Sequence, residues 1–183
     1  MSSRNFYDSQ LKNRNYLSPV GFNLKLSTKE KLDFFSNSAT VPGLNLGTAV
    51  QTTPLRNIDI PGDELLFDDF SISFLVDEDL KNYMMVQNWL RGLGFPESYQ
   101  EYKTQTTDVD NLKDTKLQYC DGTLHILNSN FKDIAKVSFT DLFPVSLTGL
   151  EFNAAEDDVI YFTAQVTFKY TIYNITDPKG NSL

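Results

Sequence analysis

The sequence predicts a mainly β domain that carries one α-helix, and three observations support this class. Aromatic residues make up 13% of the 183 residues, most of them Phe and Tyr, which favours pleated, half-buried surfaces. Several short segments alternate hydrophobic and polar residues, as strands that bury one face do. Residues 80–93 alone repeat hydrophobic residues clearly at helical spacing. With 40% hydrophobic residues, the chain is expected to build a single packed domain.

The first part of the chain predicts strands separated by turns. Residues 20–27 alternate in polarity, and residues 33–41 are expected to return as a second strand before a Pro-Gly turn at 42–43. Residues 44–61 are rich in Thr, Val and Ile and are interrupted by prolines such as Pro54. We therefore expect a long strand–loop–strand excursion at the edge of the domain.

Residues 62–80 hold the densest group of carboxylates, on both sides of a strand predicted at 70–76. These are Asp63, Glu64, Asp68 and Asp69 before the strand and Asp77, Glu78 and Asp79 after it. Their spacing does not match a calcium-binding loop, and nothing selects two of them as an acid–base pair. We interpret Asp63 as part of a turn with Gly62, and Asp77 as the N-cap of the following helix.

The predicted helix places Leu80, Val86 and Leu90 on one hydrophobic stripe and ends at Gly92 or Gly94. A polar segment without periodicity follows and predicts a long loop at 97–119. Three further strand segments are then expected, around 124–128, 137–139 and 145–152.

The clearest alternation in the chain lies near its C-terminus. It predicts a single strand over residues 160–172, roughly 40 Å long at about 3.3 Å per residue, which is longer than most strands. One face is hydrophobic: Ile160, Phe162, Ala164, Val166, Phe168, Tyr170 and Ile172. The other is mainly polar: Tyr161, Thr163, Gln165, Thr167, Lys169 and Thr171. A strand of this length is typical of a barrel or an extended sheet that projects beyond one subunit.

Catalytic and metal-binding motifs are weak. His125 is the one histidine and Cys120 the one cysteine, and neither stands at a recognised catalytic or zinc-ligand spacing. No glycine-rich phosphate loop is present. We therefore expect a protein that is not an enzyme, has no cofactor and no metal site, and acts by assembly.

The net charge and the hydropathy pattern of the chain argue against two classes of partner, nucleic acids and membranes. The net charge of −8 argues against tight binding of nucleic acid, because phosphate affinity comes mostly from Lys and Arg. The N-terminal segment lacks the hydrophobic core of a signal peptide, and no run has the length of a membrane span. We expect a soluble protein, made in the cytoplasm, without a membrane partner.

The order of short motifs resembles that of the tail tube proteins of contractile-tailed (T4-like) bacteriophages, tube-initiator relatives included. A first strand leads to the turn in ATVPGLNL, and then IPGDELLFDDFSISFLVDED precedes the helix that carries NWL. The most specific part is the stretch from Gly62 to Phe70, with Asp77-Glu78 and Trp89. LFPVSLTGLEFN then precedes the last strand. The resemblance covers residues 20–173, with gaps. An extension at 1–19 and the loop at 97–119 depart from the simplest members.

The resemblance implies an antiparallel β-sandwich or barrel with a flanking helix, over residues 20–175, between an N-terminal extension at 1–19 and a tail at 176–183. It implies hexameric rings that share one continuous barrel and stack into a tube in the virion tail. DNA passes through such a tube without specific binding. Implied partners are further copies of the chain and other tail proteins: sheath, baseplate hub or initiator, and tape measure.

Two alternatives stay open. The chain is either the repeating tube subunit or an initiator ring of the baseplate hub with the same fold. A second alternative is a type VI-like tube subunit, or a small β-sandwich binding module or hydrolase that uses His125.

Within the resemblance, two sets of residues are candidates for assembly. The excursion is expected to reach the adjacent ring through Leu46, Thr48, Val50, Thr52, Leu55 and Ile58. The polar face of the last strand is the candidate lining of the channel, through Thr163, Gln165, Thr167, Lys169 and Thr171.

Overall fold

The computed structural model describes most of the expected domain. The described residues are 17, 19, 21–27, 36–94, 96–100, 119–152 and 161–182. The predicted N-terminal extension and most of the predicted loop at 97–119 lie outside them.

The described residues form nine strands and one helix. In chain order these are β1 (Phe22–Leu26), β2 (Ser36–Thr40), β3 (Leu44–Thr52), β4 (Asn57–Phe67), β5 (Phe70–Leu75), α1 (Lys81–Gly94), β6 (Cys120–Leu127), β7 (Asp133–Leu147), β8 (Thr163–Lys169) and β9 (Ile172–Thr176). All pairings between neighbouring strands are antiparallel, as predicted.

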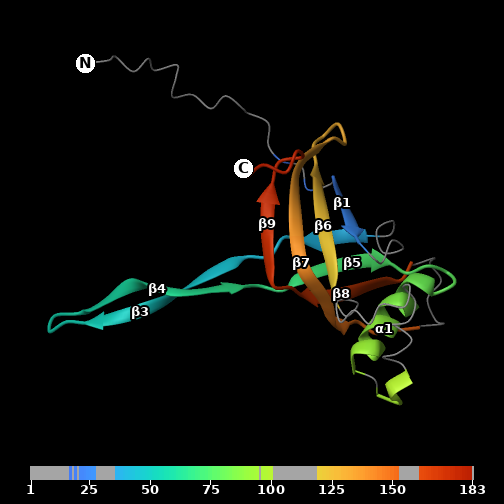
Figure 1. Cartoon of the computed structure of the whole chain (residues 1–183), viewed down its shortest axis with the longest axis horizontal. Helices are drawn as coiled ribbons and strands as arrows, with labels where there is room; N and C mark the ends of the chain where they lie inside the picture. Colours follow the sequence, from blue (N-terminus) through green and yellow to red (C-terminus); the bar gives the residue numbers. More distant parts are fainter. Residues whose placement is uncertain are drawn as a thin grey trace.

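Strand β7 belongs to two layers because it bends at its middle. Its first half pairs with β6 and β9, and β6 pairs with β1; we call these four strands sheet A. Its second half pairs with β8, which continues through β5 to β2; we call these four strands sheet B. The strands of the two sheets run in crossed directions (Figure 1). The fold is therefore a sandwich of crossed sheets that share one strand.

The predicted single strand over 160–172 is wrong, because the chain turns a corner between β8 and β9. The backbone N–H of Thr171 donates to the carbonyl of Thr140 at 3.0 Å, beside Asp141, which has φ +56°. Both chain segments thus pass from one sheet to the other at the same place. The longest strand is instead β7, with 15 residues, where we expected two separate strands at 137–139 and 145–152.

The core lies between the two sheets and is closed by α1. The alternation predicted for the strands is confirmed, since the buried positions of β1, β5 and β8 are every second residue. They are Leu24 and Leu26; Phe70, Ile72 and Phe74; and Ala164, Val166 and Phe168. Trp89 of α1 packs against Phe168, with ring centroids 6.0 Å apart. Each buried large side chain of this kind stabilises the fold by about 1.5–3 kcal/mol.

The helix ends at Gly94, one of the two predicted end points, but its start differs from the prediction. It begins at Lys81, so Asp77 is not at the N-cap position. The side chain that organises this turn is Asn82, which is 1% exposed. Its Oδ1 accepts from the N–H of Asp77 at 3.1 Å, and its Nδ2 donates to the carbonyl of Leu75 at 2.7 Å. A buried amide can satisfy both backbone groups, whereas a carboxylate has no donor.

No helix among the described residues has the length and hydrophobic character needed to cross a membrane.

Candidate assembly surfaces

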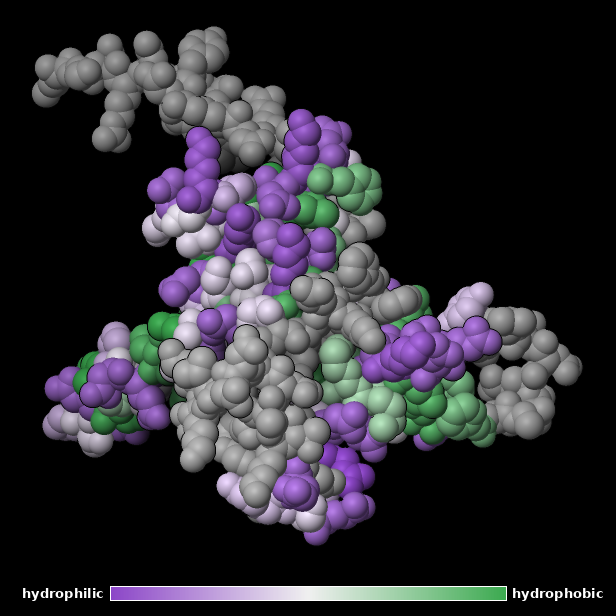
Figure 2. Space-filling view, turned by 45° about the vertical axis from the view of Figure 1, so that its right-hand side comes forward, coloured by the Kyte–Doolittle hydropathy of each residue, from purple (hydrophilic) through white to green (hydrophobic). Residues whose placement is uncertain are grey.

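Strands β3 and β4 form a hairpin that pairs with no other described strand. It projects away from the sandwich, roughly in line with β2 and β5 (Figure 1). This confirms the predicted excursion, although β4 continues to Phe67. Hydrophobic residues stand among hydrophilic ones along the hairpin, at the left of Figure 2. The exposed large ones are Leu44, Leu46, Val50, Leu55, Ile58, Ile60, Leu65 and Leu66. A two-stranded ribbon is marginally stable alone in water, so this exposed hydrophobic surface indicates a binding partner.

The residues predicted to contact another ring all lie on this hairpin but not on one face. Leu46, Thr48, Val50 and Thr52 are alternate residues of β3 and share a face. Ile58 is the cross-strand partner of Gln51, which places it on the opposite face. Leu55, at the tip, is 97% exposed.

The predicted turn at Gly62-Asp63 is wrong, because both residues lie within β4. The strand register shifts here: Leu46 pairs with Leu65 but Thr48 pairs with Pro61, so three residues of β4 stand opposite Gly47. A Cβ atom on Gly62 would lie 2.6 Å from the carbonyl oxygen of Gly47. Glycine is thus needed for the close approach of two backbones at a bulge rather than for a turn.

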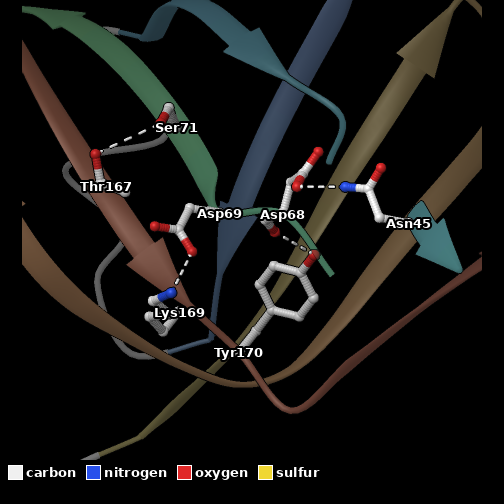
Figure 3. A network of polar contacts seen from close by, with 7 residues as sticks. All are labelled: Asn45, Asp68, Asp69, Ser71, Thr167, Lys169 and Tyr170. Atoms are coloured by element: carbon white, nitrogen blue, oxygen red, sulfur yellow. Dashed lines mark hydrogen bonds and ion pairs between the residues drawn. The ribbon is translucent and has the colours of Figure 1, made fainter. Parts of the chain in front are cut away.

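The root of the hairpin is fixed by polar contacts of Asp68, which precedes β5, and of Tyr170, which follows β8 (Figure 3). Nδ2 of Asn45 donates to Oδ1 of Asp68 at 3.0 Å, and the hydroxyl of Tyr170 donates to the carbonyl of Asp68 at 2.8 Å. The N–H of Asp68 donates to the carbonyl of Gly43 at 3.1 Å. Burial first, and then nearby Tyr173, Asp68 and Asp69, raise the pKa of Tyr170 to about 12, so its hydroxyl remains a donor.

Aromatic rings complete the same root. Phe67 packs edge-on against Tyr170 and Tyr173, with ring centroids 6.2 and 5.8 Å apart. The hydroxyl of Tyr173 donates to the carbonyl of Pro42 at 3.1 Å. The root cluster, by which we mean Asn45, Phe67, Asp68, Tyr170 and Tyr173, therefore sets the direction of the hairpin. Sequence reasoning missed this role; the one available signal was two tyrosines three residues apart at the end of an alternating strand.

The outer face of sheet B is polar. Thr163, Gln165, Thr167 and Lys169 alternate with the buried residues of β8 and point away from the core, as predicted. Next to them, Ser71 contacts Thr167 at 3.4 Å, and Nζ of Lys169 pairs with Oδ1 of Asp69 at 2.6 Å (Figure 3).

The fifth candidate for the channel lining, Thr171, is separated from the others. It lies beyond β8, at the corner between β8 and β9, where its hydroxyl contacts Asp141 at 3.4 Å.

Sheet B has two edges that no described strand covers. Strand β2 pairs with β5 only, and the second half of β7 pairs with β8 only. Each edge presents backbone N–H and carbonyl groups that can pair with another chain.

The residues considered for chemistry do not come together. Nδ1 of His125 lies 2.9 Å from Oδ2 of Asp133, on the polar outer face of sheet A. Cys120 is buried, and its sulfur contacts the hydroxyl of Ser27 at 3.4 Å. Within the described ranges, no group of three His, Cys, Asp or Glu residues is placed to hold a metal ion.

Comparison with known proteins relates the chain to phage tails. The model of the phage tail tube protein family matches residues 2–176. The chain is 25% identical over 144 residues to the tail tube terminator protein of Enterobacteria phage T4, covering 76% of each chain.

Two solved structures share the fold. The tube-terminating cap of the anti-feeding prophage matches with a TM-score of 0.59 and 14% identity, over 94% of this chain and 98% of that one. A chain of the baseplate of the same particle matches with a TM-score of 0.58 and 12% identity, over 86% and 92%. At this identity the structures establish the fold alone. The family match extends over nearly the whole sequence, and on that basis the chain belongs to the phage tail tube protein family.

Proposed function

We propose that copies of this chain assemble as hexameric rings, with sheet B of every copy lining a shared channel, and that the rings stack into a DNA-conducting tail tube. The observation that carries the proposal is that sheet B has a polar outer face and two edges that pair with no strand in the described part of the chain. Closing a sheet into a barrel removes its edges, and a polar inner face suits a water-filled channel.

The strand directions favour ring closure. Sheet B runs β2-β5-β8-β7 with antiparallel neighbours throughout, so its two edge strands run in opposite directions. Cyclic symmetry keeps every copy in the same orientation along the ring axis. The β2 edge of one copy therefore meets the β7 edge of the next in antiparallel fashion, and the alternation continues around the ring.

The size of such a ring suits a channel. Four strands from each of six copies make about 24 strands, roughly 115 Å around and about 37 Å across at ~4.8 Å per strand, before strand tilt widens it. Barrels of about 16–18 strands already enclose an aqueous channel.

The hairpin is the contact between rings in this proposal. Because it continues the direction of β2 and β5, it extends beyond the rim of its own ring by about 30 Å, the length of nine residues at ~3.4 Å each. The contact residues on it are Leu46, Thr48, Val50, Thr52, Leu55 and Ile58.

The channel surface in the proposal is formed by Thr163, Gln165, Thr167 and Lys169, with Thr171 at one end. Lys169, the cation among them, is paired with Asp69. The chain carries a net charge of −8, so DNA passes without being held. In the virion, the outside of the tube meets other tail proteins, such as the sheath.

A second candidate function is a terminating ring at the end of the tube. The observation that favours it is the 25% identity to a protein named as the tail tube terminator of phage T4. A terminating ring forms by the same lateral contacts but does not stack on itself.

Negative-stain electron microscopy of the purified full chain tests both functions. Tubes of stacked rings are expected from a repeating subunit, and single rings that bind one end of a preformed tube from a terminating subunit. A protein that stays monomeric at high concentration, with and without preformed tubes, would contradict both.

A further inference from the structure

The four strands of sheet B hold one charged residue among them, Lys169 at the end of β8. These strands are Ser36–Thr40, Phe70–Leu75, Thr163–Lys169 and the second half of β7, residues 142–147. In the whole chain, 22% of the residues are charged. Sheet A also turns one face away from the core, and its strands carry Lys25, Asp121, Asp133 and Lys136. Burial of one face therefore does not explain why sheet B has so little charge.

Hydroxyl groups cover the outer face of sheet B in rows that cross the strands. One row crosses all four strands, because its members are successive cross-strand partners: Thr40, Ser71, Thr167 and Ser146. The hydroxyls of Ser71 and Thr167 lie 3.4 Å apart (Figure 3). A shorter row lies beside it: Ser38, Ser73 and Gln165. Hydroxyl and amide groups bind water but carry no charge, so this face is hydrated and neutral.

The one charge on these strands is neutralised by a neighbouring residue. Nζ of Lys169 pairs with Oδ1 of Asp69, which comes directly before β5, at 2.6 Å (Figure 3). The two side chains are 53% and 41% exposed, and an ion pair this exposed adds little to stability. Its effect on the charge of the face is larger, because the attraction of Lys169 for an anion is offset by the adjacent carboxylate.

We propose that Asp69 keeps the channel wall neutral by pairing with Lys169, so that the wall does not hold a polyanion in transit. This rests on the proposed ring, in which sheet B lines the channel. A channel about 37 Å across keeps all of the polymer within about 18 Å of the wall, roughly two Debye lengths at about 0.15 M salt. Without Asp69, an unpaired cation from every copy would face the phosphates.

Binding of a short fluorescent double-stranded DNA to the assembled full chain tests this role. Asp69→Asn nearly keeps the shape of the side chain and leaves Lys169 without its carboxylate. At about 0.05 M salt, this variant should bind the DNA at least about tenfold more tightly than the unchanged chain. The affinity should fall steeply as salt is added, because phosphates that bind lysines release counterions. Lys169→Gln/Asp69→Asn, which also lacks the cation, should lose the binding again.

The matched control is Asp79→Asn, which changes the net charge by the same amount. It removes the carboxylate that pairs with Lys81 of α1, outside sheet B, where the two side chains are 59% and 62% exposed. This variant should bind DNA no better than the unchanged chain. Equal binding by Asp69→Asn and Asp79→Asn would show that any exposed lysine without a partner suffices, and would overturn the role of Asp69.

A second position on the same face tests charge neutralisation without changing the native ion pair. Gln165→Lys places a cation on β8 directly opposite Ser73 of β5, and it should bind DNA as Asp69→Asn does. Gln165→Lys/Ser73→Asp adds a carboxylate across from this cation and should abolish the binding. If Asp69→Asn does not fold, these two variants decide. Binding by both of them, or by neither, overturns the proposal.

Electron microscopy of the same samples separates this role from the proposed function. Rings or tubes in which Asp69→Asn binds DNA and Asp79→Asn does not support the role. Rings or tubes that bind DNA equally in all variants, the unchanged chain included, overturn it and leave the tube function standing. A strictly monomeric protein overturns both.

Discussion

At the scale of single residues, Asn82 connects the end of β5 to the start of α1. Its side chain satisfies the N–H of Asp77 and the carbonyl of Leu75 inside the protein. We predict that Asn82→Ala lowers the free energy of unfolding by about 1–3 kcal/mol, because both backbone groups lose their partner. Urea unfolding monitored by Trp89 fluorescence measures this. Lys81→Ala, which removes only an exposed ion pair with Asp79, is the control and should change stability by less than about 1 kcal/mol.

Tyr170 makes the hairpin root sensitive to alkaline pH. Its pKa is about 12 in the folded protein and about 10 in the unfolded chain, so its neutral form is favoured by folding. The stability that it contributes is complete below about pH 10 and is lost as the pH rises toward about 12. Because Tyr170 is only partly buried, the loss is smaller than the full pKa difference would give.

The variant Tyr170→Phe isolates this contribution. At neutral pH it should be less stable than the unchanged chain by about 1 kcal/mol, because the bond to the carbonyl of Asp68 is lost. Above about pH 10 the difference in unfolding free energy between the two proteins should shrink. A difference that stays constant between neutral pH and about pH 11 would show that Tyr170 does not titrate in this range.

At the scale of elements, a substitution in the hairpin should affect the assembly of copies far more than the stability of the fold. Val50 is 57% exposed on a ribbon outside the core. We predict that Val50→Asp abolishes stacking of rings and lowers the free energy of unfolding by less than about 1 kcal/mol, a cost that comes from the carboxylate of Asp59 directly across the hairpin. Ultracentrifugation and thermal unfolding measure the two effects. Ile134→Asp, at an exposed position of sheet A, should alter neither, and normal stacking of Val50→Asp would remove Val50 from the interface.

The same elements show how far sequence patterns reach. Local patterns located α1, with its end at Gly92 or Gly94, the buried faces of β5 and β8, and the hairpin, because these depend on local spacing. The corner between β8 and β9 could not be predicted, since alternation continues through Tyr170 and Thr171. It is set by pairing with Thr140, a contact between distant parts of the chain.

Gly62 is a second example of what sequence patterns cannot predict. Gly62 next to Asp63 is typical of a turn, yet its reason is the backbone of Gly47 on the facing strand. Asp77 before a hydrophobic stripe is typical of a helix N-cap, but the side chain that organises this turn is Asn82. Sequence alone does not reveal which polar residue becomes buried, because burial depends on the packing of α1 against β5.

At the scale of the whole molecule, sheet A and sheet B have different roles in the proposed tube. Sheet A and α1 bury one side of sheet B, and among the described residues no strand covers its polar face or either of its edges. The subunit buries its own hydrophobic core, but its sheet B can still pair with strands of another copy. In the proposed tube, the edges of sheet B form the contacts within a ring, and the ends of sheet B form the contacts between rings. A variant can therefore lose stacking and still form rings.

The net charge of each copy opposes the proposed contacts within a ring and the proposed contacts between rings. Each copy carries a net charge of −8, and the proposed assembly would bring like-charged copies together. Raising the ionic strength from about 0.01 M to about 0.15 M shortens the Debye length from about 30 Å to about 8 Å, which screens this repulsion while hydrophobic contacts persist. We predict that the fraction of protein in rings and tubes rises over this range, as measured by sedimentation velocity. The variant Asp63→Asn/Glu64→Gln removes two exposed negative charges from the hairpin and should assemble at lower ionic strength. Assembly that falls as salt is added would mean that attraction between opposite charges on neighbouring copies outweighs the repulsion between whole subunits.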